Sequence, residues 1–347
     1  MVPYSCTQTD GARETATRPR AREDLDMKGP TTLEASPHPQ DGLTLRAWSK
    51  EWIGFSVHLK PKTQVGYESL LRARILPVFG AIPLEEIDGL AIRRWVAGMH
   101  EEGLSASRTQ QSYRLLSQIL ISAVECGLLD HDPSRGVKLP RSVRSEMACL
   151  TAEEVERLIS AVAASYRPLI HILAYGGLRW GEATALRRSR CDLDADRLIV
   201  AESIADVNGR VVFGETKTHR VRKTRIPSFL VEELRVHLEK VGSEPDALLF
   251  TAPRGGPLRI ANFRRRVWWP ALEAAGLARS IRIHDLRHTC ASLLIRQGVH
   301  AKAIQNHLGH SSIQITMDRY GHLLPDQLDD LASSLDMVHA HVIAIAD

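Results

Sequence analysis

The sequence predicts a mainly α-helical protein with a small antiparallel β-sheet, divided into two domains. Its 347 residues are enough for roughly two domains of about 100 to 200 residues each. Apolar side chains recur at helical spacings of three and four through most of the chain, and short β-like runs are confined to residues 191–227. Hydrophobic residues make up 44% and charged residues 25%, which is typical of a globular protein and excludes a fibrous or wholly disordered one.

The first part of the chain predicts a tail, a helical domain and a linker. Residues 1–41 are rich in Thr, Pro, Arg, Asp and Glu and poor in large apolar side chains, so we expect a disordered tail. Residues 42–129 predict four helices, which begin after Thr44 as N-cap and then cover residues 63–78, 88–100 and 105–126. Residues 130–149, with prolines and few apolar side chains, are expected to form an extended linker.

Residues 150–322 predict a second domain of mixed α and β structure. Thr151 and Glu154 have the spacing of a capping box at its first helix. Further helices are expected at residues 166–174, 180–188, 229–241, 260–275, 285–297, 301–308 and 313–319. Strands are expected at residues 198–201, 211–213 and 221–226, with a turn at Asn208 and Gly209 between the first two.

Residues 323–347 predict a C-terminal helical tail with one apolar stripe. The stripe consists of Leu324, Leu328, Leu331, Leu335, Val338 and Val342. It would pack either against its own domain or against a neighbouring protomer.

The densest group of chemically capable residues is His284-Asp285-Leu286-Arg287-His288. It resembles the H-E-x-x-H pattern of zinc proteases, in which two histidines bind metal and a Glu activates water. An Asp is shorter than that Glu, and the permanent cation of Arg287 would repel a bound metal ion, so a zinc hydrolase is disfavoured. Alone, the segment would be equally consistent with a polar helix start.

Other motifs accompany this segment. Leu308-Gly309-His310-Ser311-Ser312 and Thr316-Met317-Asp318-Arg319-Tyr320-Gly321-His322 follow it, and Gly177-Leu178-Arg179-Trp180-Gly181-Glu182 lies upstream. With these motifs in this order, residues 43–331 resemble the tyrosine recombinase, or phage integrase, family. The resemblance implies a core-binding (SAM-like) domain of four helices followed by an α+β tyrosine recombinase catalytic domain.

By this resemblance Tyr320 is the nucleophile, and the rest of the catalytic set is Arg179, Lys217, His284, Arg287 and His310. The chemistry of the residues agrees. Guanidinium groups match the charge that gathers on a phosphodiester under attack, and a phenol of pKa about 10 ionises far more readily than an aliphatic hydroxyl. His284 would accept the phenolic proton and His310 would donate to the phosphate. In the family, the lysine at the position of Lys217 is the general acid for the leaving 5′-oxygen.

Neighbouring polar residues are expected to support this set. Glu182 would orient an arginine or cap a helix, and His288 and His322 are more readily read as supporting than as catalytic residues. Since the phosphotyrosine bond conserves the energy of the phosphodiester, we expect neither a cofactor nor a metal.

The partners implied are double-stranded DNA at specific recombination sites, further copies of the chain in a tetramer, and DNA-bending accessory proteins. Basic residues in both domains are candidate contacts to DNA phosphates. They are Lys60, Lys62, Arg72, Arg74, Arg93, Arg94, Arg108, Arg114, Arg264, Arg265 and Arg266. The last three could equally be a solvated helix face.

The chain therefore predicts a site-specific DNA recombinase that integrates or excises a phage or mobile element. A Xer-like resolvase of chromosome dimers and a non-catalytic DNA-binding protein of the same fold are the alternatives, and a topoisomerase would share the cleavage chemistry. The five scattered cysteines, the missing signal peptide and the missing long apolar segment lead us to expect a cytoplasmic, nucleoid-associated protein with no membrane partner.

Overall fold

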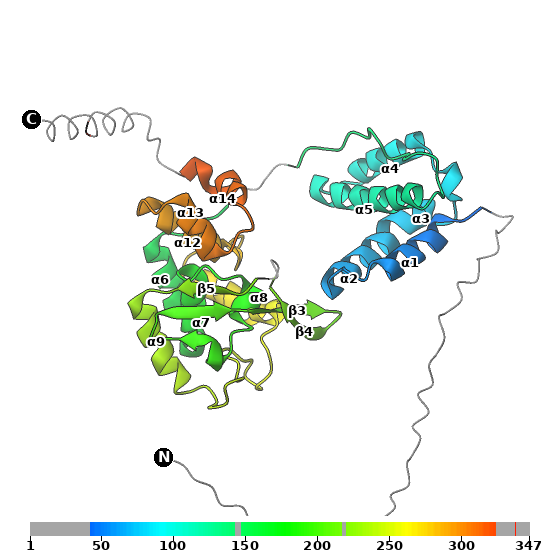
Figure 1. Cartoon of the computed structure of the whole chain (residues 1–347). Helices are drawn as coiled ribbons and strands as arrows, with labels where there is room; N and C mark the ends of the chain where they lie inside the picture. Colours follow the sequence, from blue (N-terminus) through cyan, green and yellow to red (C-terminus); the bar gives the residue numbers. More distant parts are fainter. Residues whose placement is uncertain (1–41, 143–146, 217–219, 324–336, 338–347) are drawn as a thin grey trace, which may run out of the picture. The chain divides into compact units, whose positions relative to one another are not determined.

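The structure is a computed structural model that describes residues 42–142, 147–216, 220–323 and 337. The predicted disordered tail, Lys217 and the apolar stripe of the C-terminal tail lie outside these ranges. The predicted mainly helical fold is confirmed, and Figure 1 shows a helical first domain and a mixed second domain, here called the catalytic domain after its predicted role. No helix in the described ranges is both long and apolar enough to cross a membrane.

The first domain is a helical bundle whose helices begin and end close to the predicted positions. Its main helices are α1 (Leu45–Phe55), α2 (Pro61–Leu70), α4 (Gly89–Glu101) and α5 (Ala106–Glu125). Short elements follow α2, namely a π-helical turn (Leu71–Ile75), α3 (Leu76–Phe79) and a 3₁₀ turn (Leu84–Glu86). The predicted helix at residues 63–78 is therefore one run interrupted by a wider turn.

Side-chain caps fix where three of these helices start. The side chains of Thr44, Asp88 and Ser105 each accept a hydrogen bond from the backbone amide three residues further on. Inside the bundle, the buried indole of Trp48 donates to the carbonyl of Ile119, 2.9 Å away, which joins α1 to α5.

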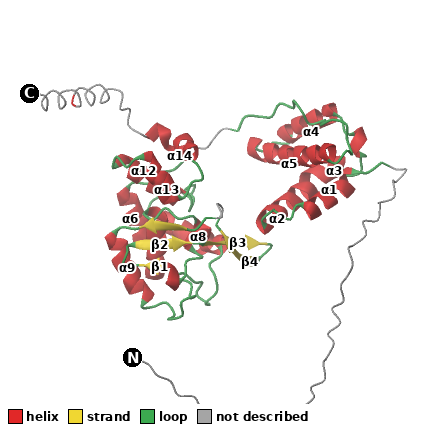
Figure 2. Cartoon of the chain, viewed as in Figure 1, coloured by secondary structure: helices red, strands yellow, loops and turns green. Residues whose placement is uncertain are grey.

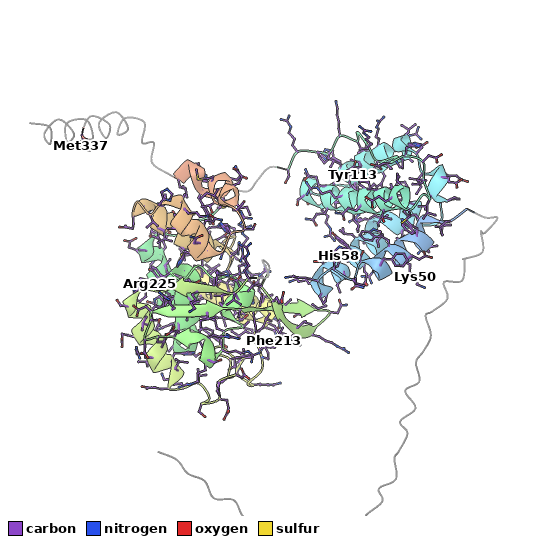
Figure 3. All side chains as sticks on the ribbon, viewed as in Figure 1. Lys50, His58, Tyr113, Phe213, Arg225 and Met337 are labelled. Atoms are coloured by element: carbon purple, nitrogen blue, oxygen red, sulfur yellow. The ribbon has the colours of Figure 1, made fainter. Side chains whose placement is uncertain are left out.

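The first part of the predicted linker packs on this bundle. Tyr113 on α5 (Figure 3) donates its phenol proton to the carbonyl of Ser134 at 2.6 Å, and Gln110 donates to the carbonyl of Pro140 at 2.8 Å. The described residues of the linker form neither a helix nor a strand. The domain boundaries themselves remain predictions.

The catalytic domain contains both helices and strands (Figure 2). Its longer helices are α6 (Ala152–Ala161), α7 (Arg167–Ala174), α9 (Ser228–Leu238), α12 (Asp285–Arg296), α13 (Ala301–Leu308) and α14 (Ile313–Tyr320). The helix predicted at residues 260–275 is built from α10 (Ile260–Phe263), a π-helical segment (Arg264–Trp268) and α11 (Trp269–Ala274). Short 3₁₀ turns lie at Ala164–Tyr166, Arg188–Arg190 and Gly321–Leu323. The capping box of Thr151 and Glu154 is confirmed.

The helix predicted at residues 180–188 is much shorter, because α8 spans only Trp180–Ala183. After it, the backbone pairs with a distant segment of the chain. The amide of Arg188 donates to the carbonyl of Ala247, and the amide of Leu249 donates to the carbonyl of Leu186, each at 2.9 Å. These tertiary hydrogen bonds replace those that a longer helix would have made.

The predicted antiparallel sheet is present, but as two small sheets. One has the order β1 (Cys191–Asp192), β2 (Arg197–Val200), β5 (Arg222–Arg225), and the other is a hairpin of β3 (Glu202–Val207) and β4 (Arg210–Glu215). Asn208 and Gly209, both with positive φ, form the turn of this hairpin. The turn was predicted, but it connects β4 to β3, a strand that was not predicted, and not to β2. Phe213 on β4 (Figure 3) lies under the guanidinium of Arg187, 5.2 Å from it.

Three helices at the C-terminal end of the catalytic domain form the frame of the candidate site. In Figure 1 α12, α13 and α14, in orange, lie together, and α12 also packs against α7. A small apolar cluster between them contains Cys290, Ile295, Ile304, Leu308 and Tyr320. The site is therefore held by packing, with Tyr320 inside that packing.

Candidate active site

Arg179 is placed by the glycines that precede it. Gly177 has φ 64°, and a Cβ at this position would lie 2.6 Å from Leu308 Cδ2 and 3.0 Å from Cys290 Sγ. Only glycine fits both the backbone conformation and the space. The chain thus passes close to α12 and α13 immediately before Arg179.

Glu182 connects Arg179 to a second arginine that we did not predict, Arg222 on β5. Its Oε1 lies 2.8 Å from Arg179 Nη1, and its Oε2 accepts from the backbone amide of Arg179 at 2.9 Å. The same carboxylate binds Arg222 through two further hydrogen bonds, of 3.0 and 2.7 Å. Both expectations for Glu182, that it orients an arginine and that it caps a helix, are confirmed. No short spacing in the sequence reveals Arg222, because it lies 40 residues from its partner.

The carboxyl of Glu182 is ionised despite being buried. Burial alone would raise its pKa, but the hydrogen bonds and charge of Arg222, followed by those of Arg179, lower the pKa to about 2. The Glu182 carboxylate therefore carries a full charge between two guanidinium groups.

Arg287 on α12 is almost completely buried and holds two distant segments together. Its Nη1 donates to the carbonyl of Gly177 and its Nη2 to the carbonyl of Leu308, each at 2.5 Å. Burial, followed by the charge of Arg179, lowers the pKa of Arg287 to about 9, so it stays a cation at neutral pH. Since a guanidinium has five N–H donors, three remain for another acceptor.

Tyr320, the predicted nucleophile, lies between two histidines. Its Oη is 2.7 Å from Nδ1 of His288, and its ring stacks on that of His310 with a centroid distance of 6.3 Å and an interplanar angle of 10°. His310 Nδ1 is bound to Thr316 Oγ1 at 2.9 Å, and its buried Nε2 has no hydrogen-bond partner among the described residues. Burial raises the pKa of Tyr320 to about 12.

The histidines of the site are neutral at physiological pH. Desolvation, followed by the charges of Arg287 and Arg179, lowers the pKa of His284 to about 4 and that of His310 to about 3. Desolvation, followed by the neighbouring His284, also lowers the pKa of His288 to about 4. Each ring therefore offers one donor and one acceptor nitrogen, while the positive charge of the site resides on its arginines.

The hydrogen-bond partner of the Tyr320 hydroxyl is not His284, the residue that the sequence hypothesis gave as proton acceptor. His284 immediately precedes α12, and its ring meets that of His288 edge to face at 5.0 Å, whereas the hydroxyl of Tyr320 is bonded to His288. Lys217, the predicted general acid, lies outside the described residues. The zinc hypothesis finds no support, because no group of three or more His, Cys, Asp or Glu residues in the described ranges is arranged to hold a metal ion.

The candidate DNA contacts of the first domain are mostly available to a ligand. Five of them are exposed, namely Lys62, Arg72, Arg93, Arg94 and Arg114, while Lys60, Arg74 and Arg108 are half-buried. Arg74 forms an ion pair with Glu102 at 3.3 Å. Arg108 and Arg114 line a groove of about 340 Å³ between α2 and α5, together with Gln111 and Gln118.

The arginine run of the catalytic domain lies on the π-helical segment before α11. Arg264, Arg265 and Arg266 are all exposed. The guanidinium of Arg264 lies 5.3 Å from the centre of the Trp269 ring, and that of Arg279 lies 4.9 Å from it. Basic and aromatic side chains are thus associated on this segment, and stacking leaves the edges of both guanidinium groups available to acceptors.

Comparison with known proteins agrees with this arrangement. Residues 148–327 match the phage integrase family, and residues 44–100 match the phage integrase N-terminal SAM-like domain. An integrase of Mycobacterium phage FRAT1 is 30% identical over 79% of this chain and 83% of its own length.

Two solved structures share the fold. The Tn1549 transposon integrase in complex with a circular intermediate DNA has a TM-score of 0.74 and 20% identity, covering 85% of this chain and 100% of that one. A lambda integrase tetramer bound to a Holliday junction has a TM-score of 0.62 and 22% identity, covering 83% of this chain and 79% of that one. Family match, relative and fold agree: the chain belongs to the phage integrase family and is a site-specific tyrosine recombinase.

Proposed function

We propose that this recombinase cleaves and rejoins double-stranded DNA through a 3′-phosphotyrosyl bond to Tyr320, in the integration or excision of a phage or other mobile element. The observation that carries the proposal is the convergence on one phenol of residues far apart in the sequence. The ring of His310 stacks on that of Tyr320, and the charge of Arg287 acts on its phenol. The charge of Arg179, from a third segment, acts on both Arg287 and His310.

The roles follow from the charge that develops in the reaction. When Oη of Tyr320 attacks the phosphorus, negative charge gathers on the two non-bridging oxygens. The remaining donors of Arg179 and Arg287 and the unpartnered Nε2 of His310 supply hydrogen bonds to those oxygens. Loss of one such donor is expected to lower the cleavage rate about 10²- to 10³-fold.

The bond to the 5′-oxygen breaks as the bond to Tyr320 forms. The leaving oxygen takes a proton, for which we propose Lys217. A 5′-hydroxyl from a second strand then attacks the phosphotyrosine, and the same steps in reverse release Tyr320 and join the new strands.

Binding to DNA is supported by the basic residues of both domains and by the DNA complex of the Tn1549 integrase. We propose that the groove of Arg108 and Arg114 and the exposed arginines beside Trp269 contact DNA phosphates. The lambda integrase tetramer on a Holliday junction supports assembly of four protomers, with accessory DNA-bending proteins as further partners.

The test uses a nicked duplex built from the sequence that the full chain selects out of a random DNA pool. The nick makes the released fragment, which carries the free 5′-hydroxyl, short enough to diffuse away, so a covalent adduct accumulates. We expect adduct with the native chain in the presence of a chelator and none with Tyr320→Phe. Adduct formed by Tyr320→Phe would place the nucleophile elsewhere, and no adduct with the native chain would favour a non-catalytic DNA-binding protein.

The assay for the biological reaction is strand exchange between two duplexes. Exchange between dissimilar partner sites indicates integration, whereas exchange only between identical sites indicates a Xer-like resolvase. Relaxation of supercoiled DNA without exchange would indicate a topoisomerase.

A further inference from the structure

The hydroxyl of Tyr320 has one hydrogen-bond partner among the described residues, Nδ1 of His288. The two atoms are 2.7 Å apart, and both side chains are buried, with 1% of Tyr320 and 4% of His288 exposed. Water therefore has little access to the phenolic proton. Among the residues that the structure describes, Nδ1 of His288 is the atom in position to receive the proton that this nucleophile must lose.

The direction of this hydrogen bond follows from the protonation of the two groups. Burial raises the pKa of Tyr320 to about 12, so the phenol keeps its proton in the resting site. His288, with its pKa lowered to about 4 by desolvation and then by His284, is neutral. The phenol therefore donates and Nδ1 accepts, which leaves the ring proton on Nε2.

Other groups around His288 do not compete for this role. His284 touches His288 edge to face and is not bonded to the phenol, and His310 uses Nδ1 for Thr316. The charged and titratable groups that influence His288 are His284 and Asp285 on its own helix, Arg282 before that helix, Arg319 and Tyr320 on α14, and His310 beside α14.

We infer that His288, and not His284, accepts the phenolic proton of Tyr320 during DNA cleavage, an inference that rests on the proposed role of Tyr320 as nucleophile. The Oη–H bond breaks as the proton passes to Nδ1. The oxygen lone pair forms the bond to phosphorus, and the bond from phosphorus to the 5′-oxygen breaks. In the rejoining step the proton returns from Nδ1 to Oη.

The resting pKa values decide the timing of this transfer. Because burial raises the pKa of Tyr320 and desolvation lowers that of His288, a complete transfer before attack would be strongly unfavourable. The transfer therefore accompanies attack, because an oxygen that is bonding to phosphorus loses its affinity for the proton. The charge of a DNA phosphate beside His288 also raises the basicity of its ring.

The test measures single-turnover cleavage of the nicked duplex by the full chain. His288→Leu removes the acceptor, and His288→Asn restores an acceptor oxygen near the position of Nδ1 that cannot take up a proton. Both are expected to cleave about 10²- to 10⁴-fold more slowly than the native chain. The control His131→Asn changes an exposed histidine to which no part in the site is assigned, and should cleave at the native rate.

Two further readouts separate proton acceptance from a structural role. The native rate should be flat between about pH 6 and 9, whereas the His288→Leu rate should rise with pH, because hydroxide must then remove the proton. On a duplex with sulfur in place of the bridging 5′-oxygen, whose leaving group needs no proton, the defect of both variants should persist.

The inference is overturned if either variant, folded and DNA-bound, cleaves within about threefold of the native rate. It is equally overturned if the sulfur substrate removes the defect, since His288 would then serve the leaving group. If Tyr320→Phe abolishes the adduct while both His288 variants cleave normally, this inference alone fails. An adduct formed by Tyr320→Phe overturns the proposed function and this inference together.

Discussion

Replacing Glu182 by Gln should destabilise the catalytic domain strongly and in a pH-dependent way. The side chain is 1% exposed and binds both Arg179 and Arg222. A carboxyl whose pKa falls from 4.5 to about 2 on folding contributes about 3 kcal/mol to the free energy of unfolding at pH 7. This agrees with the cost of about 3 to 5 kcal/mol for removing one partner of a buried ion pair.

The pH dependence follows from the sign of this shift. Because the pKa of Glu182 is lower in the folded than in the unfolded chain, its stabilisation is complete above pH 4.5 and is lost as the pH falls towards 2. The free energy of unfolding of Glu182→Gln should lie about 3 kcal/mol below that of the native chain at pH 7 and about 1.5 kcal/mol below it at pH 3.

Urea unfolding of both chains at the two pH values measures this difference. Glu232→Gln is a matched control, since this exposed side chain lies 3.8 Å from Arg235 and should change stability by less than about 1 kcal/mol. A Glu182→Gln penalty below about 1 kcal/mol, or one equal at both pH values, would refute the reasoning.

Three further predictions concern the backbone, the first domain and DNA. Gly177→Ala should lower the free energy of unfolding by about 2 to 4 kcal/mol, because its Cβ would meet Leu308. The control Gly276→Ala, at a similar φ with open space around it, should lower it by about 1 to 2 kcal/mol. Equal penalties would show that the contact with Leu308 does not matter. Trp48→Phe should cost about 1 to 3 kcal/mol in urea unfolding, since the carbonyl of Ile119 loses its donor, and an unchanged midpoint would contradict this. With about eight to ten phosphate contacts, log affinity for DNA should fall against log salt with a slope of roughly −7 to −9, and a slope near zero would exclude the proposed basic surfaces.

Most of the helices could be predicted because local signals set their limits. Thr44, Thr151 and Gly309 mark the ends of helices α1, α6 and α13 through a cap or a left-handed turn, and each is visible in the sequence. The end of α8 and strand β3 could not be predicted. The first depends on backbone pairing with residues 245–249, and the second has too few β-branched or aromatic residues to stand out.

The candidate site also contains residues that the sequence predicts and residues that it does not. Arg287, His310 and Tyr320 lie in motifs that are recognisable within a few residues, and the structure brings them together. The roles of His288 and Arg222 depend on partners 32 and 40 residues away, so they emerge only from the folded chain. The spacing of the motifs identifies which residue types gather at the site, but it does not specify which nitrogen faces which oxygen.

The two backbone hydrogen bonds of Arg287 have a consequence for the history of this protein. The guanidinium for which we propose a contact to the DNA phosphate also ties Gly177 to Leu308 inside the domain. A descendant that abandoned recombination could replace Tyr320 by Phe and keep the buried ring in the apolar cluster, yet it would be expected to retain Arg287 in order to fold. Among decayed copies of such genes, the phenol and not the buried arginine is therefore the informative marker of a working enzyme.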